Sequence, residues 1–196
     1  ATKFINEKNQ PLRFCYLENT FINPKAYEGR LSETTQSGAE LIGDESIDAD
    51  AMMIALTVKC LKNSGLRDFK VEIGNVNFYR SLIKQSEFTP SQEKRIINLI
   101  EEKNFYGVEE FTAGISGVKS ADIFLKLPSL FGNIERIKGA LEYKLNKEAK
   151  DSINNLIRLH ELLEIYKVNE YVSYDLGMIS KYEYYTGVIF KGFAAG

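Results

Sequence analysis

Two strand-like runs separated by a polar loop occupy residues 11–43, and they constrain the fold more than any other stretch. Residues 12–21 are rich in Phe, Tyr and Leu and partly alternate between apolar and polar, as a half-buried β-strand does. Pro24 and Gly29 interrupt this pattern, and a second strand is expected at 34–42. The loop between the strands is too long for a tight turn. Loops of that length are usually either functional or disordered.

The second strand is expected to place Gln36, Gly38 and Glu40 on one face, because side chains alternate along a strand. Gln36 and Glu40 would then lie about 13 Å apart, at roughly 3.3 Å per residue, with a bare floor at Gly38 between them. The side chains of Gln36 and Glu40 could bind the two charged ends of a small zwitterion. The pattern alone favours the alternative, a solvated outer face of an antiparallel sheet.

Composition indicates a globular chain with a real core and no specialised chemistry. The chain has 196 residues, 44% of them apolar, and a formal net charge of −2, which argues against a nucleic-acid partner. No apolar run approaches the ~18 residues of a membrane helix. Two cysteines, Cys15 and Cys60, and one histidine predict no metal site, no disulfide framework and no cofactor, and favour a cytoplasmic location.

The rest of the chain predicts alternating helices and short strands. A helix capped by Asp48 or Asp50 should run to a C-terminal Gly65, because acidic residues suit a helix start and glycine suits its end. His160 falls beside the apolar stripe of the longest helix, where a packed or rim position is favoured over a ligand or general-base role. Further elements are expected at 68–73 (strand), 77–85, 92–103, 108–111, 123–130, 134–143 and 149–166 (helices), and 171–176 and 188–193 (strands).

Three segments resemble histidyl-tRNA synthetases. Residues 21–36 are similar to the family's motif 2 loop, the Gln36-x-Gly38-x-Glu40 run to its histidine-reading strand, and residues 183–190, Glu-Tyr-Tyr-Thr-Gly-Val-Ile-Phe, to its histidine-binding segment. The resemblance implies a histidine site formed by Gln36, Glu40, Tyr184 and Tyr185, with Arg30 and Glu183 as possible further pocket contacts.

The same resemblance implies the fold. We expect an α+β chain with an antiparallel β-sheet flanked by helices, a partial class II aminoacyl-tRNA synthetase-like core. The core would comprise residues 1–88 and 144–196, and residues 89–143 would form a helical insertion. The core is expected to be truncated at both ends, because relatives carry motif 1 before it and a Gly-Gly-Arg-Tyr-Asp run after it.

The departures from the family pattern concern the nucleotide. Ile22 stands where the family has an ATP-clamping arginine, Pro24 where a glutamate reads adenine, and Ser180 where an arginine would polarise the carboxylate. Ser32 and Thr34 replace a further arginine and an adenine-stacking phenylalanine. Adenylation needs cations to stabilise charge that develops at the α-phosphorus, so the implied site keeps its amino-acid contacts and loses its triphosphate contacts.

A site that keeps its amino-acid contacts and loses its triphosphate contacts resembles that of the regulatory subunits of ATP phosphoribosyltransferase. These subunits are a catalytically silent branch of the family. That resemblance implies a non-catalytic subunit that binds L-histidine, forms a dimer through its synthetase-like core and regulates the short catalytic subunit in histidine biosynthesis. Two alternatives stay open. One is a divergent histidyl-tRNA synthetase that activates histidine with ATP and charges tRNA, and the other is an α+β binding module that shares only the fold.

Overall fold

A computed structural model describes residues 10–23, 31–115, 120–180 and 184–194. The chain divides into two compact units, residues 1–49 and 50–196, and the boundary falls in the first turn of helix α1 (Ile47–Asn63). Each unit is therefore described by itself.

The first unit is built on an antiparallel pair of ten-residue strands, β1 (Leu12–Phe21) and β2 (Glu33–Ile42). Their register runs without interruption from Leu12 opposite Ile42 to Phe21 opposite Glu33. At the loop end, the backbone N–H of Ile22 donates to the carbonyl of Ser32 at 2.9 Å. Both expected strands are confirmed, to within one residue at the start of β2.

Helix α1 begins earlier than the acidic residues predicted. The hydroxyl of Ser46 accepts a hydrogen bond from the backbone N–H of Ala49 at 3.2 Å, so Ser46 caps the helix and Asp48 and Asp50 lie inside it. The predicted capping role of Asp48 or Asp50 is wrong, because a serine just before them already satisfies a free N–H group. The expected end at Gly65 is confirmed, since this glycine has a φ of +92°.

The second unit contains a four-stranded sheet in the order β4-β5-β3-β6. β3 (Phe69–Asn75) pairs antiparallel with β6 (Val188–Ala194) on one side and parallel with β5 (Val172–Asp175) on the other, and β5 pairs antiparallel with β4 (Phe131–Gly132). The sequence predicted an antiparallel sheet, and the parallel pair is the departure from it. It arises because the chain between β3 and β5, which includes helices and the short strand β4, returns to the same end of the sheet, as a parallel connection requires.

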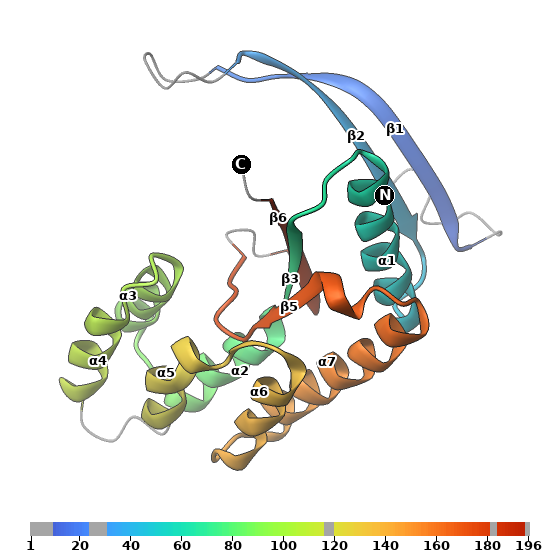
Figure 1. The fold of residues 1–196 in the computed structure, drawn as a ribbon. Coiled ribbons are helices and arrows are strands. Elements are labelled where there is room, and N and C mark those ends of the chain that lie inside the picture. Colours follow the sequence, from blue (N-terminus) through green and yellow to red (C-terminus); the bar gives the residue numbers. More distant parts are fainter. Residues whose placement is uncertain (1–9, 24–30, 116–119, 181–183, 195–196) are drawn as a thin grey trace. The chain divides into compact units, whose positions relative to one another are not determined.

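Helices pack against this sheet and against one another (Figure 1). α2 and α7 lie side by side: the side-chain amide of Asn146, the N-cap of α7, donates to the Ser81 carbonyl of α2 at 3.0 Å. The fully buried side chains Phe78, Leu156 and Leu163 come from these two helices. The helices are α2 (Val76–Ser86), α3 (Pro90–Glu101), α4 (Phe105–Ala113), α5 (Ala121–Lys126), α6 (Ile134–Gly139) and α7 (Lys147–Ile165), with 3₁₀ turns at Leu127–Ser129, Ala140–Glu142 and Asn169–Tyr171.

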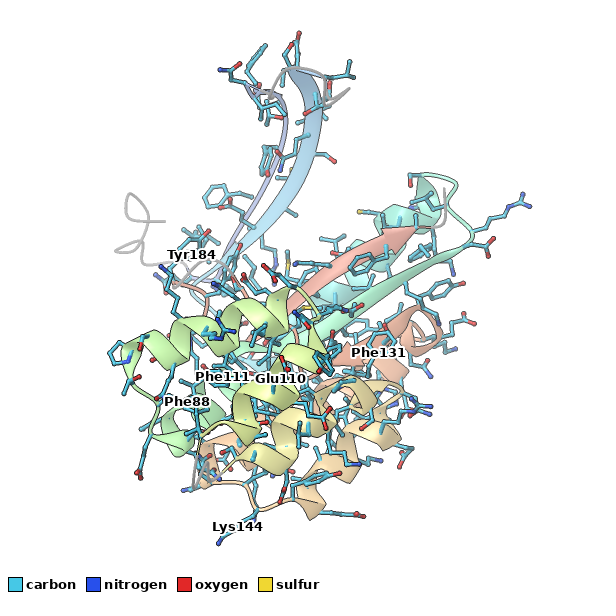
Figure 2. The ribbon with its side chains drawn as sticks, turned by 90° about the vertical axis from the view of Figure 1, so that its left-hand side faces the viewer. Phe88, Glu110, Phe111, Phe131, Lys144 and Tyr184 are labelled. Atoms are coloured by element: carbon cyan, nitrogen blue, oxygen red, sulfur yellow. The ribbon has the colours of Figure 1, made fainter. Side chains whose placement is uncertain are left out.

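Short helices fill the region between α2 and α7, as the sequence predicted. α3 starts at the expected Thr89-Pro90 pair, where Thr89 and Gln92 form a reciprocal capping box. Phe88 packs edge-on against Phe111, with ring centroids 5.5 Å apart (Figure 2). It also packs tilted against Phe124, at 6.0 Å. These helices thus share an aromatic contact. The proposed division into a core and an insertion at 89–143 stays a prediction.

His160 lies in a packed position, as expected. Its Nδ1 atom is 3.0 Å from the hydroxyl of Tyr174, and its Nε2 atom is 3.6 Å from a carboxylate oxygen of Glu164. Tyr174 is almost fully buried, and burial raises the pKa of its hydroxyl. The histidine therefore gives the buried tyrosine a hydrogen-bond partner across α7 and β5.

Candidate functional site

The predicted polar face of β2 exists, but its centre is covered. Gln36, Gly38 and Glu40 lie opposite Glu18, Tyr16 and Phe14 of β1. The side-chain amide of Gln36 donates to the Tyr16 hydroxyl at 3.1 Å, and a Cβ atom at Gly38 would overlap the Tyr16 ring. The expectation of a bare floor at Gly38 is wrong in this structure. A cross-strand aromatic ring takes the space that a glycine leaves open.

The two tyrosines predicted to hold histidine are adjacent in space. The rings of Tyr184 and Tyr185 have centroids 4.7 Å apart, and Tyr184 is 72% exposed whereas Tyr185 is 41% exposed. They belong to the second unit, while Gln36 and Glu40 belong to the first. Each half of the predicted site is therefore defined within its own unit. Arg30 and Glu183 lie outside the described residues.

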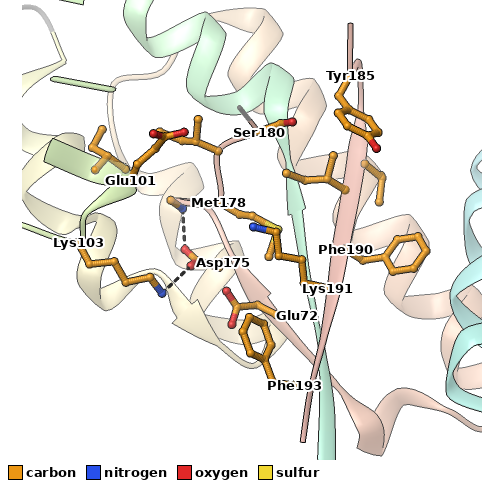
Figure 3. Close-up of a pocket in the computed structure, with 15 residues that line it drawn as sticks. Glu72, Glu101, Lys103, Asp175, Met178, Ser180, Tyr185, Phe190, Lys191 and Phe193 are labelled. Atoms are coloured by element: carbon orange, nitrogen blue, oxygen red, sulfur yellow. Dashed lines mark hydrogen bonds and ion pairs between the residues drawn. The ribbon is translucent and has the colours of Figure 1, made fainter. Parts of the chain in front are cut away.

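A pocket of about 640 Å³ lies on the second unit, and Tyr185 and Ser180 form part of its wall (Figure 3). It opens on the face of the sheet that carries Glu72 of β3 and Lys191 of β6, which are cross-strand neighbours. Its volume lies in the range of small-molecule sites. The other lining residues are Ile100, Glu101, Lys103, Asp175, Gly177, Met178, Ile179, Val188, Ile189, Phe190 and Phe193.

Two carboxyl groups meet in this pocket. Burial, together with the neighbouring carboxyl group of Asp175, raises the pKa of the Glu72 carboxyl. Asp175 is held in place by the backbone N–H of Gly177, which donates to its Oδ1 atom at 2.7 Å. The Nζ atom of Lys103 lies 3.5 Å from the Oδ2 atom of Asp175. The pocket thus combines a paired carboxyl site with a nearby cation.

Sequence reasoning did not select Glu72, Asp175, Lys103 or Lys191 as site residues. The alternation of residues 69–73 already turned Glu72 away from the apolar face formed by Phe69, Val71 and Ile73. That face is buried, which is consistent with the alternation. What the pattern could not show is that β5, a hundred residues later, pairs with β3 and brings Asp175 to the same place.

Replacement of Glu72 by glutamine should flatten the pH dependence of stability. Because the pKa of Glu72 is raised in the folded state, the fold binds this proton more tightly than the unfolded chain does. The resulting stabilisation is full below the ordinary glutamate pKa and is lost as the pH rises through the raised pKa. Urea unfolding at a series of pH values should therefore show a steeper loss of stability for the original chain than for Glu72→Gln. Parallel curves would contradict the assignment.

No group of three or more His, Cys, Asp or Glu side chains among the described residues is arranged to hold a metal ion. No helix in the described ranges has both the length and the apolar character that crossing a membrane requires.

The mixed sheet, its flanking helices and the pocket above it define a class: the α+β core of class II aminoacyl-tRNA synthetases. A model of the histidyl-tRNA synthetase family matches residues 1–196. The chain belongs to this family.

Comparison with individual proteins shows which members of the family this chain is similar to. The chain is 38% identical over 199 residues to the ATP phosphoribosyltransferase regulatory subunit of Clostridium acetobutylicum and 36% identical over 199 residues to that of Clostridium novyi. Both alignments cover 100% of this chain, and they cover 49% and 47% of those proteins. The chain therefore spans about half the length of the curated relatives it matches.

Solved structures give the same fold. The crystal structure of an ATP phosphoribosyltransferase regulatory subunit/histidyl-tRNA synthetase from Bacillus halodurans C is similar, with a TM-score of 0.86 and 31% identity, over 98% of this chain and 51% of that chain. The ATP phosphoribosyl transferase (HisG:HisZ) complex from Thermotoga maritima contains a chain that matches with a TM-score of 0.76 and 19% identity, over 98% of this chain and 67% of that chain. The expected synthetase-like fold is confirmed.

Proposed function

We propose that this chain is the synthetase-like part of a non-catalytic regulatory subunit of ATP phosphoribosyltransferase. It would bind L-histidine and regulate the short catalytic subunit, which performs the first step of histidine biosynthesis. The relatives that share 36–38% of its residues along its whole length bear that name. The Thermotoga maritima structure is named as a complex of two kinds of chain, which supports a catalytic partner for this one.

The observation that carries the proposal is the charge of the pocket on the second unit. Ser180, which stands where the family has an arginine, lines this pocket. Among the described residues that line the pocket, the carboxyl groups, on Glu72, Glu101 and Asp175, outnumber the cations, on Lys103 and Lys191. A triphosphate needs an excess of positive charge to be held and activated. The second candidate, a histidyl-tRNA synthetase, is therefore disfavoured.

Regulation requires that histidine bind one arrangement of the complex better than another. Gln36 and Glu40 on β2 and the Tyr184–Tyr185 pair are the residues that we propose hold the amino acid. In the described structure Tyr16 covers Gly38, so histidine binding to β2 would require this exposed ring to turn aside. We also propose that two copies associate through the synthetase-like core and that the complex acts in the cytoplasm, where the exposed thiols of Cys15 and Cys60 would stay reduced.

Glu40→Gln should weaken histidine binding by about tenfold or more, because it removes a charged hydrogen-bond acceptor. The test is calorimetry on the full-length protein purified with the short catalytic subunit. Glu45→Gln, an exposed carboxyl change beyond the hairpin, is the control and should leave binding unchanged. Absence of histidine binding at millimolar concentration would end the proposal. Histidine-dependent ATP–pyrophosphate exchange above background would favour the synthetase instead.

A further inference from the structure

The lining of the pocket on the second unit is chemically mixed. Ile100, Met178 and Ile189 supply apolar surface, and the carboxyl groups of Glu72 and Asp175 line the same pocket. Figure 3 shows these two carboxyl groups beside each other. Pockets that combine apolar walls with a few convergent polar groups are the usual form of small-molecule sites. A ligand that fits this lining would carry one charged group on an apolar body.

The carboxylate of Asp175 is fixed in position, but its counter-ion is not. Asp175 is 7% exposed and is anchored by the Gly177 N–H, so its carboxylate has little freedom to move. The side chain of Lys103, by contrast, is 65% exposed, and its ammonium is 3.5 Å from Asp175 and 5.9 Å from the centroid of the Phe131 ring. Lys103 can therefore leave the carboxylate for solvent or for the aromatic face at little cost.

Glu72 experiences charges from each element around it. Asp175 approaches from β5, Lys103 from the turn after α3 and Lys191 from β6. Two carboxylates side by side repel each other, and a cation between them removes the repulsion. An ammonium or imidazolium group at that point would be attracted by both carboxylates at once. Lys191, on the neighbouring strand, carries the same charge as such a ligand and would favour one that bears a single positive group.

We propose that this pocket binds a small organic cation and that Glu72 and Asp175 together receive its charged group. Binding displaces the ammonium group of Lys103 from Asp175. The apolar wall then covers the uncharged part of the ligand. The second unit alone forms this site, which shares Tyr185 with the histidine site proposed above. Binding of benzylamine is measured without histidine, so its failure and the failure of the histidine proposal are distinguishable.

The test uses benzylamine, a single ammonium group on an apolar ring, and benzyl alcohol as its uncharged counterpart. Amide chemical shifts of the chain, followed by NMR during titration, should show saturable benzylamine binding with a dissociation constant of about 1 mM, a value typical for a ligand of this size. Benzyl alcohol should bind about tenfold more weakly or not at all. Equal binding of the two compounds, or no benzylamine binding at 10 mM (about ten times the expected constant), would overturn the proposal.

Charge variants separate a role in recognition from a role in folding. Glu72→Gln and Asp175→Asn should each weaken benzylamine binding by about tenfold, because each removes one charged partner. Lys103→Asn should instead strengthen it severalfold, since the competing cation is gone. Asparagine suits the φ of +53° at this position, so the change spares the backbone. A purely structural cluster would not give opposite signs.

Two matched variants serve as controls. Glu110→Gln and Asp151→Asn remove exposed carboxyl groups of the same unit that do not line the pocket, and both should leave benzylamine affinity unchanged. Affinity should also fall as the pH is lowered toward the raised pKa of Glu72, while the ammonium group stays charged. Weakening by the control variants as much as by Glu72→Gln, or an affinity independent of pH, would contradict the role of the carboxyl pair.

Discussion

Phe78→Ala should lower the free energy of unfolding of the second unit by about 3–5 kcal/mol, the usual cost of removing a fully buried aromatic ring. Phe78 lies on α2 and has no exposed surface. α2 starts directly where β3 ends, and Asn75, the last residue of β3, caps it by accepting a hydrogen bond from the Asn77 N–H at 3.0 Å. A cavity under α2 therefore also weakens the strand that carries Glu72.

Urea unfolding followed by circular dichroism would measure this change. Tyr106→Ala, on α4, is the matched control, because this aromatic side chain is 72% exposed. Its expected effect is within about 0.5 kcal/mol. If the two variants lost similar stability, the packing of α2 against α7 described here would not hold.

Gly74→Ala should both destabilise the second unit and impair its pocket. A Cβ atom at position 74 would lie 2.6 Å from the Cβ atom of Met178 and 2.9 Å from the backbone oxygen of Asp175. Backbone cannot move aside as a flexible side chain can, so we expect a loss of about 1–3 kcal/mol, as for an overpacked core. The turn at 175–178 must shift as well, which moves Asp175 away from Glu72 and should weaken benzylamine binding.

Gly139→Ala, in contrast to Gly74→Ala, should not lower the free energy of unfolding. Gly139 is the last residue of α6, and no heavy atom lies within 4 Å of an added Cβ atom there apart from the adjacent residues and the backbone of the helix itself. Alanine is favoured over glycine in a helix by up to about 1 kcal/mol, so this variant should be neutral or stabilised. Equal losses for Gly74→Ala and Gly139→Ala in urea unfolding would show that close packing at Gly74 is not the cause.

Local signals in the sequence located many elements well. Thr89-Pro90 marked the start of α3, because threonine caps a helix N-terminus and proline is favoured in the first turn. Gly65 marked the end of α1, because glycine tolerates a positive φ. The start of α1 was misplaced at Asp48 or Asp50, because several residues near it can cap a helix and only the backbone decides which one does. Ser46 does so here.

The candidate site was predictable to a smaller extent. The alternation of β2 correctly placed Gln36, Gly38 and Glu40 on one face, but the ring that fills the space at Gly38 comes from Tyr16 on the partner strand. Cross-strand neighbours depend on register, and register is set by the pairing of two strands rather than by either one alone.

The sequence by itself determined the local patterns: the strands β1 and β2 and the breaks at Pro24 and Gly65. The resemblance to the family implied the loss of cations at Ile22 and Ser180. Only the tertiary structure decided that β3 and β5 lie side by side in parallel and that Glu72 and Asp175 share one pocket. The physical reason is distance along the chain. Patterns over a few residues fix local geometry, whereas contacts across a hundred residues depend on how the helices between them pack.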